Sequence, residues 1–191
     1  MTRSKVSVPK KLSPEPKHDG GPSKIKARKS VSLQRWENIK PWQQDNEYIL
    51  RHYRPCSNDH WKSIASLSYL HNQTVNVITH IIGASMFAAA ALSQCYSSSP
   101  SIRYSTEDRI VLTFFFIGAI FCFSSSAYFH LIGNHSHEVY NAWLTVDFLG
   151  IICLIVGTSF PLAYYTYPCH PRTLQACLTA VRPLSSYLRF L

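Results

Sequence analysis

Three long apolar runs dominate the chain after its first third, at residues 75–94, 110–132 and 142–165. Each run approaches or exceeds the ~20 residues that an α-helix needs to cross about 30 Å of hydrocarbon. Because a bilayer offers no water to unpaired backbone groups, a helix is the expected structure for each run. The pattern therefore predicts an all-α integral membrane protein with three transmembrane helices.

Two polar segments precede these runs. Residues 1–46 are basic and contain few large apolar side chains, so we expect a disordered cytoplasmic tail. Residues 58–72 begin with Asn58 and Asp59, which are favourable N-cap residues, but the segment is too short and too polar to cross a bilayer. This segment is predicted to be an interfacial helix.

Residues 172–191 follow the third apolar run. They begin with a helical pattern, which the dipeptide Arg182-Pro183 is expected to interrupt. We interpret them as a truncated or aberrant C-terminal segment.

The charge is divided unevenly along the chain. Residues 1–62 contain 14 Lys and Arg against 6 Asp and Glu, whereas residues 63–191 contain 5 against 4, and no Lys or Arg lies between Arg109 and Arg172. A soluble enzyme rarely covers its surface in this way, so a simple cytosolic enzyme is excluded. The positive-inside rule places the basic tail in the cytoplasm, and the membrane is expected to be the endoplasmic reticulum or the plasma membrane. The basic run at residues 24–30 fits attraction to anionic lipids better than binding to nucleic acid.

A few polar side chains lie where a bilayer makes them costly. Asp147 is the only acidic residue within the three predicted spans, His80 lies near the start of the first, and His130 ends the second, one turn after Ser126. An up-down-up arrangement brings these residues to the same side of the membrane. The pattern fits a metal site, a proton relay or a polar packing network, and the spacing does not distinguish among the three.

Several motifs occur in a specific order over about residues 47–171. They are Tyr53-Arg-Pro, His71-Asn-Gln-Thr-Val-Asn-Val-Ile-Thr-His80, Ser126-Ala-Tyr-Phe-His130 and Val146-Asp-Phe-Leu-Gly-Ile151. In these motifs the chain resembles the progestin and adipoQ receptor family, the adiponectin-receptor-like and haemolysin-III-related membrane proteins, and its fungal members in particular. We therefore interpret residues 47–171 as a haemolysin-III-related membrane domain.

The resemblance implies a seven-helix bundle with a cytoplasmic N-terminus and a zinc ion held by three histidines and a water. On this basis His130 is the expected zinc ligand, and Asp147 and Ser126 are the expected catalytic residues beside the metal. The implied reaction is hydrolysis of a ceramide-like lipid amide, and the implied partners are membrane lipids and such a substrate.

The chain departs from the family pattern at two points. Gln73 stands where the family usually has Glu, and the H-x-x-x-H motif that supplies two further zinc ligands does not occur. We therefore expect three of the seven helices, a truncated chain or one that needs a second subunit, and an incomplete catalytic site. The alternative is a non-enzymatic membrane subunit without bound metal that self-associates or pairs with a full-length relative.

Overall fold

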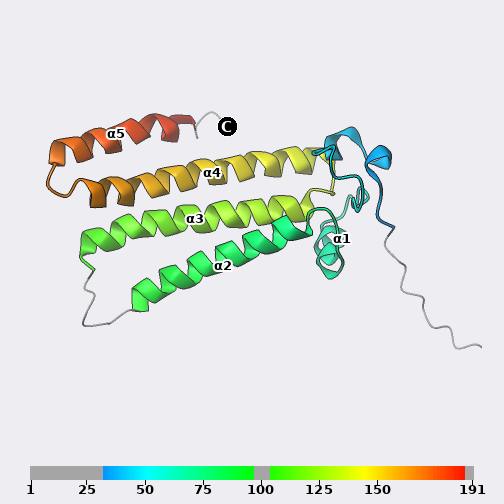
Figure 1. Ribbon diagram of the computed structural model, residues 1–191, viewed down its shortest axis with the longest axis horizontal. Helices are drawn as coiled ribbons and strands as arrows, with labels where there is room; N and C mark the ends of the chain where they lie inside the picture. Colours follow the sequence, from blue (N-terminus) through cyan, green and yellow to red (C-terminus); the bar gives the residue numbers. More distant parts are fainter. Residues whose placement is uncertain (1–31, 97–103, 188–191) are drawn as a thin grey trace, which may run out of the picture. The chain divides into compact units, whose positions relative to one another are not determined.

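The computed structural model describes residues 32–96 and 104–187 (Figure 1). Residues 1–31, which are part of the tail predicted at 1–46, and residues 188–191 lie outside the described residues. Within the described ranges the protein is all-helical, with no strand and a single isolated bridge between Gln34 and Tyr53. The predicted fold class is confirmed.

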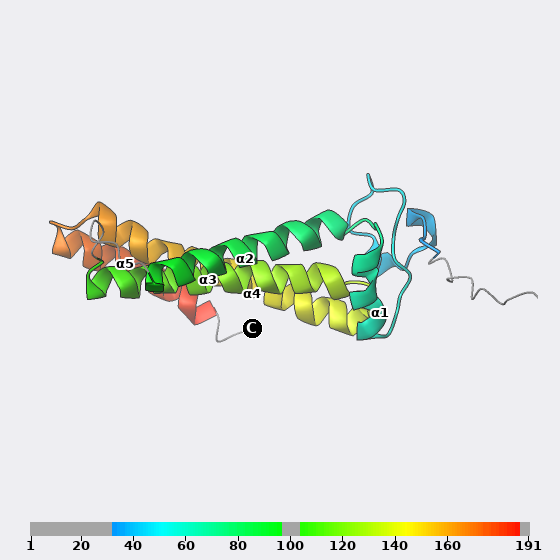
Figure 2. The ribbon, with the colours of Figure 1, turned by 90° about the horizontal axis from the view of Figure 1, so that it is seen from below.

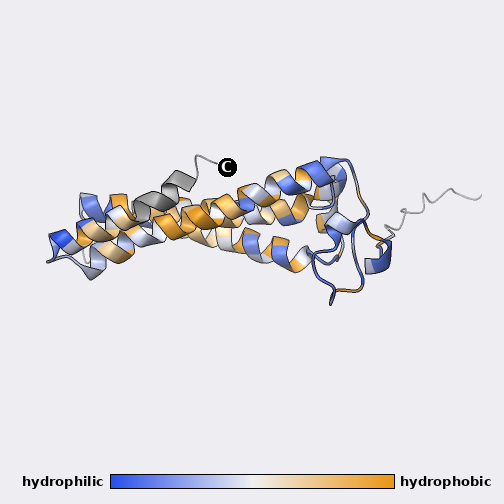
Figure 3. Ribbon diagram, turned by 90° about the horizontal axis from the view of Figure 1, so that it is seen from above, coloured by the Kyte–Doolittle hydropathy of each residue, from blue (hydrophilic) through white to orange (hydrophobic). Residues whose placement is uncertain are grey.

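Three helices are long and apolar enough to cross a membrane: α2 (Thr74–Tyr96), α3 (Thr106–Ile132) and α4 (His137–Thr166). They lie side by side in antiparallel order, and apolar residues predominate along their length (Figures 1 and 3). The first matches its predicted span closely, whereas α3 and α4 begin before theirs. Ser105 forms a capping box with Asp108, and Ser136 accepts a hydrogen bond from the Val139 amide, so each helix is extended by a polar first turn.

Helices α3 and α4 contact each other at the level of their backbones. A Cβ atom on Gly118 would lie 2.7 Å from the Cys153 carbonyl oxygen, and one on Gly157 would lie 2.7 Å from the Phe114 carbonyl oxygen. The two helices can therefore approach each other this closely because a glycine lies at each point of contact.

Helix α2 packs against α3 through side chains instead. The Phe87 ring lies 5.5 Å from the Phe123 ring and 5.7 Å from the Phe115 ring, centroid to centroid. Much of the remaining surface of α2 is apolar and uncovered: Met86, for example, is 67% exposed. This surface suits lipid or further helices.

Residues 32–73 form a folded segment, here called the cap, at the end of the bundle where α2 and α4 begin and α3 ends (Figure 2). It contains the 3-10 helices η1 (Trp36–Asn38), η2 (Pro41–Gln43) and η3 (Ser66–Ser68) and the short helix α1 (His60–Ala65). Two expectations are corrected here. The interfacial helix predicted at 58–72 is shorter than expected and consists of α1 and η3 only. Residues 69–73 are not helical, and a turn at 72–73 leads into α2.

The second correction concerns the disordered tail predicted for residues 1–46. Residues 32–46 are folded, because Gln34 and Tyr53 exchange two backbone hydrogen bonds of 2.7 and 3.0 Å and Trp36 packs on the Tyr53 ring. These contacts join residues 34 and 36 to residue 53. A prediction from the composition of the tail alone does not detect contacts between residues this far apart.

A fifth helix, α5 (Pro171–Tyr187), packs against α4 (Figure 1). It continues through Pro183, so the interruption expected at Arg182-Pro183 is wrong. Proline removes one helical hydrogen bond and kinks a helix without always ending it, and Pro161 is likewise accommodated within α4.

Candidate functional site

The candidate site lies where α3 approaches the cap. His130 occupies the last turn of α3, and its ring centroid lies 5.7 Å from that of His80 on α2, edge to face. Ser126 is buried one turn earlier. The structure thus brings together the two histidines that the sequence singled out within the spans.

Asp147 lies at a similar depth on α4. One turn later, a Cβ on Gly150 would lie 2.9 Å from the Cys122 Cα atom, and on the other side the Trp143 ring lies 4.2 Å from the Tyr128 ring. This antiparallel register places Asp147 level with residues 124–125, within one turn of Ser126. The predicted catalytic pair therefore occupies one layer of the bundle, one turn from His130.

Arg54 holds the end of α3 from the cap. Its side chain is almost fully buried and donates hydrogen bonds to the carbonyl oxygens of His130 (2.7 Å) and Leu131 (2.6 Å) and to Ser66 Oγ (2.8 Å). Burial lowers the pKa of the Arg54 guanidinium to about 10, so it remains charged at neutral pH. A cation at the C-terminal end of a helix is also favoured by the helix dipole.

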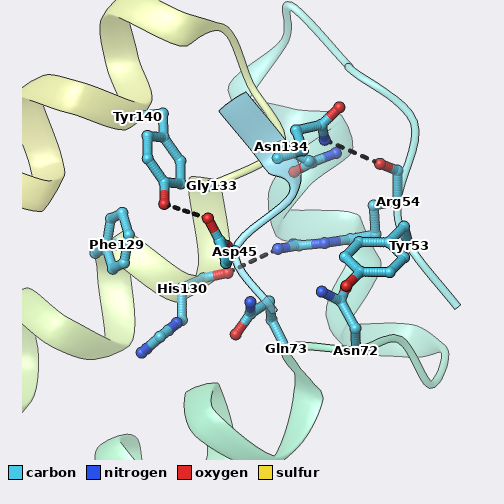
Figure 4. A pocket seen from close by; sticks show the side chains of 11 residues that line it. Asp45, Tyr53, Arg54, Asn72, Gln73, Phe129, His130, Gly133, Asn134 and Tyr140 are labelled. Atoms are coloured by element: carbon cyan, nitrogen blue, oxygen red, sulfur yellow. Dashed lines mark hydrogen bonds between the residues drawn. The ribbon is translucent and has the colours of Figure 1, made fainter. Parts of the chain in front are cut away.

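A cavity of about 30 Å³ lies between the cap and the facing ends of α3 and α4, and Arg54, His130 and Tyr140 are among the residues that line it (Figure 4). The Tyr140 hydroxyl donates a 2.7 Å hydrogen bond to Asp45 at its edge, and burial raises the pKa of the Asp45 carboxyl. Asn134 also lines the cavity, and its buried Oδ1 atom has no hydrogen-bond partner among the described residues. The volume is enough for about two water molecules, which would satisfy such an acceptor.

His71 stabilises the start of α2. Its amide donates to Thr74 Oγ1 (2.8 Å), and its Nδ1 atom accepts a 3.1 Å hydrogen bond from the Gln73 amide. Burial, assisted by the charge of Arg54, lowers the pKa of His71 to about 4, so the ring is neutral at pH 7. Gln73, where the family usually has Glu, lines the cavity beside it.

The expected zinc site needs several protein ligands around one point. A zinc ion takes four ligands, three of them from the protein in a catalytic site. His130 and His80 are close enough to contribute together, but no group of three His, Cys, Asp or Glu side chains in residues 32–96 and 104–187 is arranged to hold a metal ion. The described residues therefore do not make a zinc site by themselves.

Asp45, Arg54 and Asn134 contribute to this site without having been predicted from the sequence. Of these three residues, Arg54 lies within the Tyr53-Arg-Pro motif that carried the family resemblance, and this motif is the sequence feature that could have identified it. Its partners His130 and Leu131 lie more than 70 residues away in the chain, so local patterns do not connect them.

An all-helical architecture with three helices able to span a bilayer and polar side chains between them defines an integral membrane protein. A model of the haemolysin-III-related family matches residues 68–185, and the chain belongs to this family. The resemblance inferred from the motifs is thereby confirmed.

The relatives include adiponectin-receptor proteins from animals and fungi. The chain is 36% identical over 148 residues to the adiponectin receptor protein of Drosophila melanogaster, covering 76% of this chain and 33% of that one. It is 31% identical over 153 residues to the ADIPOR-like receptor IZH2 of Saccharomyces cerevisiae, covering 79% and 48%. It is 30% identical over 154 residues to heptahelical transmembrane protein 1 of Arabidopsis thaliana, covering 77% and 46%. The chain thus spans between a third and a half of the length of these relatives.

Proposed function

We propose that this chain is part of a zinc-dependent membrane receptor or lipid-amide hydrolase acting in lipid and metal homeostasis. In this proposal His130 is one zinc ligand, Ser126 and Asp147 are catalytic residues, and the other ligands come from polypeptide beyond the described residues. The chain is incomplete for catalysis by itself. The N-terminus is cytoplasmic, and the lipid-amide substrate reaches the site from the bilayer.

The main support is the way His130 is held. Its backbone carbonyl is fixed by the buried Arg54, and its ring lies beside His80 within a helix able to span the bilayer. A ligand side chain works best when its helix and its surroundings are rigid before the metal binds. The cavity beside His130 adds room for water at the same end of α3.

Zinc content tests the role of His130. The tagged chain would be co-expressed with the yeast relative, purified in mild detergent and analysed for zinc by mass spectrometry. We expect zinc to co-purify with the chain and to be lost in His130→Ala. The matched control is His137→Ala, an exposed histidine that stacks on Trp42, and this variant should keep its zinc. Zinc unchanged in His130→Ala would show that this ligand assignment is wrong.

A second preparation tests incompleteness. The chain purified away from any relative is expected to hold far less than one zinc per molecule and to release no fatty acid from a ceramide. Stoichiometric zinc or clear hydrolysis by the isolated chain would contradict the proposal that it lacks part of the site.

One observation favours the alternative, a non-enzymatic membrane subunit. No third metal-binding side chain joins His80 and His130 among the described residues, and α2 leaves an apolar surface on which another helix can pack. This alternative would be supported if the chain associates with the yeast relative, or with a second copy of itself, while zinc is absent from both preparations.

A further inference from the structure

A second pocket lies at the end of the bundle opposite the cap, here called the far end. At this end α3 begins, α4 ends and α5 begins. The pocket has a volume of about 340 Å³ and is lined by Asp108, Tyr164, Tyr165, Pro168 and Leu174. Small-molecule sites commonly measure about 300–1,000 Å³, so a lipid headgroup can be accommodated.

The pocket carries negative charge. Asp108 accepts hydrogen bonds from the Ser105 amide (2.9 Å) and the Tyr165 hydroxyl (3.0 Å), which fix the carboxylate in place. Among the described residues the only ion pair is formed by Lys62 and Asp59, so Asp108 has no cationic partner within that part of the chain.

The end of α4 adds to this charge. Its last turn contains no basic residue, so the partial negative charge of the helix C-terminus is not balanced by a side chain of that turn. This helix terminus therefore adds partial negative charge beside the Asp108 carboxylate, at an end of the bundle where Arg109, Arg172 and the N-termini of α3 and α5 contribute positive charge.

The remaining walls are aromatic and apolar. The Tyr164 and Tyr165 rings are perpendicular with centroids 5.0 Å apart, and Tyr165 is 51% exposed. Aromatic faces attract cations, and aromatic cages are used to bind quaternary ammonium groups. Leu174 and Pro168 provide apolar contacts suited to methyl groups.

We propose that the far-end pocket formed by Asp108, Tyr164 and Tyr165 binds the quaternary ammonium group of a choline compound. A quaternary ammonium needs no hydrogen-bond acceptor, which suits a carboxylate whose two oxygens each already accept a hydrogen bond. A primary ammonium lacks the methyl groups that would pack against the aromatic and apolar walls. Because tyrosines gather at membrane interfaces, the headgroup of a choline phospholipid can reach this pocket directly.

Native mass spectrometry of the 191-residue chain, released from nanodiscs with equal phosphatidylcholine and phosphatidylethanolamine, tests this proposal. A cation–π contact at an exposed site is worth about 0.5–1 kcal/mol, so we expect bound phosphatidylcholine to be enriched about two- to fivefold. Asp108→Asn keeps the side-chain shape and an acceptor for the Ser105 amide, and should abolish the enrichment. The matched control is Glu107→Gln, which removes the neighbouring exposed charge and should not change it.

Tyr165 provides an independent pair of variants. Tyr165→Leu should reduce the enrichment more than Tyr165→Phe, because phenylalanine retains the aromatic face and loses only the hydroxyl that donates to Asp108. Circular dichroism of each variant establishes that its helical content is unchanged. Enrichment that survives Asp108→Asn, or that is lost equally in Glu107→Gln, would overturn the proposal.

A further arm distinguishes a membrane lipid from a soluble ligand. The chain in phosphatidylglycerol nanodiscs would be titrated with phosphocholine. Phosphocholine binding that depends on Asp108, without phosphatidylcholine enrichment, supports the same ammonium site with a soluble occupant. Phosphatidylcholine enrichment without phosphocholine binding supports the bilayer lipid, and the absence of both would overturn the proposal.

Discussion

Helix α3 is held differently by its two sets of neighbours. Helix α4 and the cap contact its backbone: glycines bring α4 against it, and Arg54 bonds the carbonyl groups at its end. Helix α2 contacts it through rings such as Phe87 and Phe123. Backbone-level contacts leave no freedom to adjust, whereas rings can rotate. We infer that α3, α4 and the cap form a rigid unit and that α2 is the more adaptable neighbour.

The largest expected effect comes from breaking the cap's contact with α3. Arg54→Met leaves the His130 and Leu131 carbonyls without their side-chain donor, and each buried group left without a partner costs about 1–3 kcal/mol. We expect the free energy of unfolding to fall by about 3–5 kcal/mol, measured by SDS titration in mixed micelles. Arg51→Met, an exposed site with the same change of charge, is the control. Equal losses in both variants would show that the buried bonds do not stabilise the end of α3.

The sequence predicts those parts of this arrangement that depend on residues close together in the chain, and not those that depend on residues far apart. The three spans follow from local hydrophobicity, and even their polar first turns could be read from Ser105 and Ser136 as N-caps. The depth shared by His80, His130 and Asp147 follows from antiparallel order alone. The cap does not follow, because its hydrogen bonds join segments far apart in sequence, such as Asn134 with Pro55.

The candidate site was predictable to a similar extent. Motifs singled out His130, Ser126 and Asp147, and their roles as ligand and catalytic residues stay predictions. What no local pattern revealed is the polar cavity beside His130, since Asp45 reaches it only through the folded cap. A metal site also depends on the distances among several side chains, which spacing along one chain does not fix.

Lowering the pH tests the junction between the cap and α2. The pKa of His71 is about 4 in the folded protein against an ordinary value near 6.5, so the unfolded chain binds a proton first as the pH falls. The stability that the folded protein gains from a neutral His71 is fully present above pH 6.5 and is lost progressively as the pH falls toward 4. At pH 5 this residue alone should lower the free energy of unfolding by about 2 kcal/mol relative to pH 7.

The measurement is SDS unfolding at pH 7 and pH 5 for the natural chain and for His71→Asn, whose amide oxygen can replace Nδ1 as the acceptor for Gln73. The variant should lose most of this pH dependence. His52→Asn, at an exposed position in the same cap, should retain it. A natural chain equally stable at both pH values would show that His71 can be protonated without cost.

The smallest effect is also the most direct test of the difference between the neighbours of α3. Alanine at Gly118 would place Cβ 2.7 Å from the Cys153 backbone oxygen, whereas alanine at Gly83 of α2 would place it 2.8 Å from the Phe123 ring. The first contact can be relieved only by moving a helix and the second by turning a ring, while both variants gain about 1 kcal/mol of helix propensity. We therefore expect Gly118→Ala to destabilise by about 1–2 kcal/mol net and Gly83→Ala to be nearly neutral in the same SDS titration. If the two variants lose the same stability, α2 is packed as rigidly as α4, and the adaptable surface on which further helices would assemble has to be sought elsewhere.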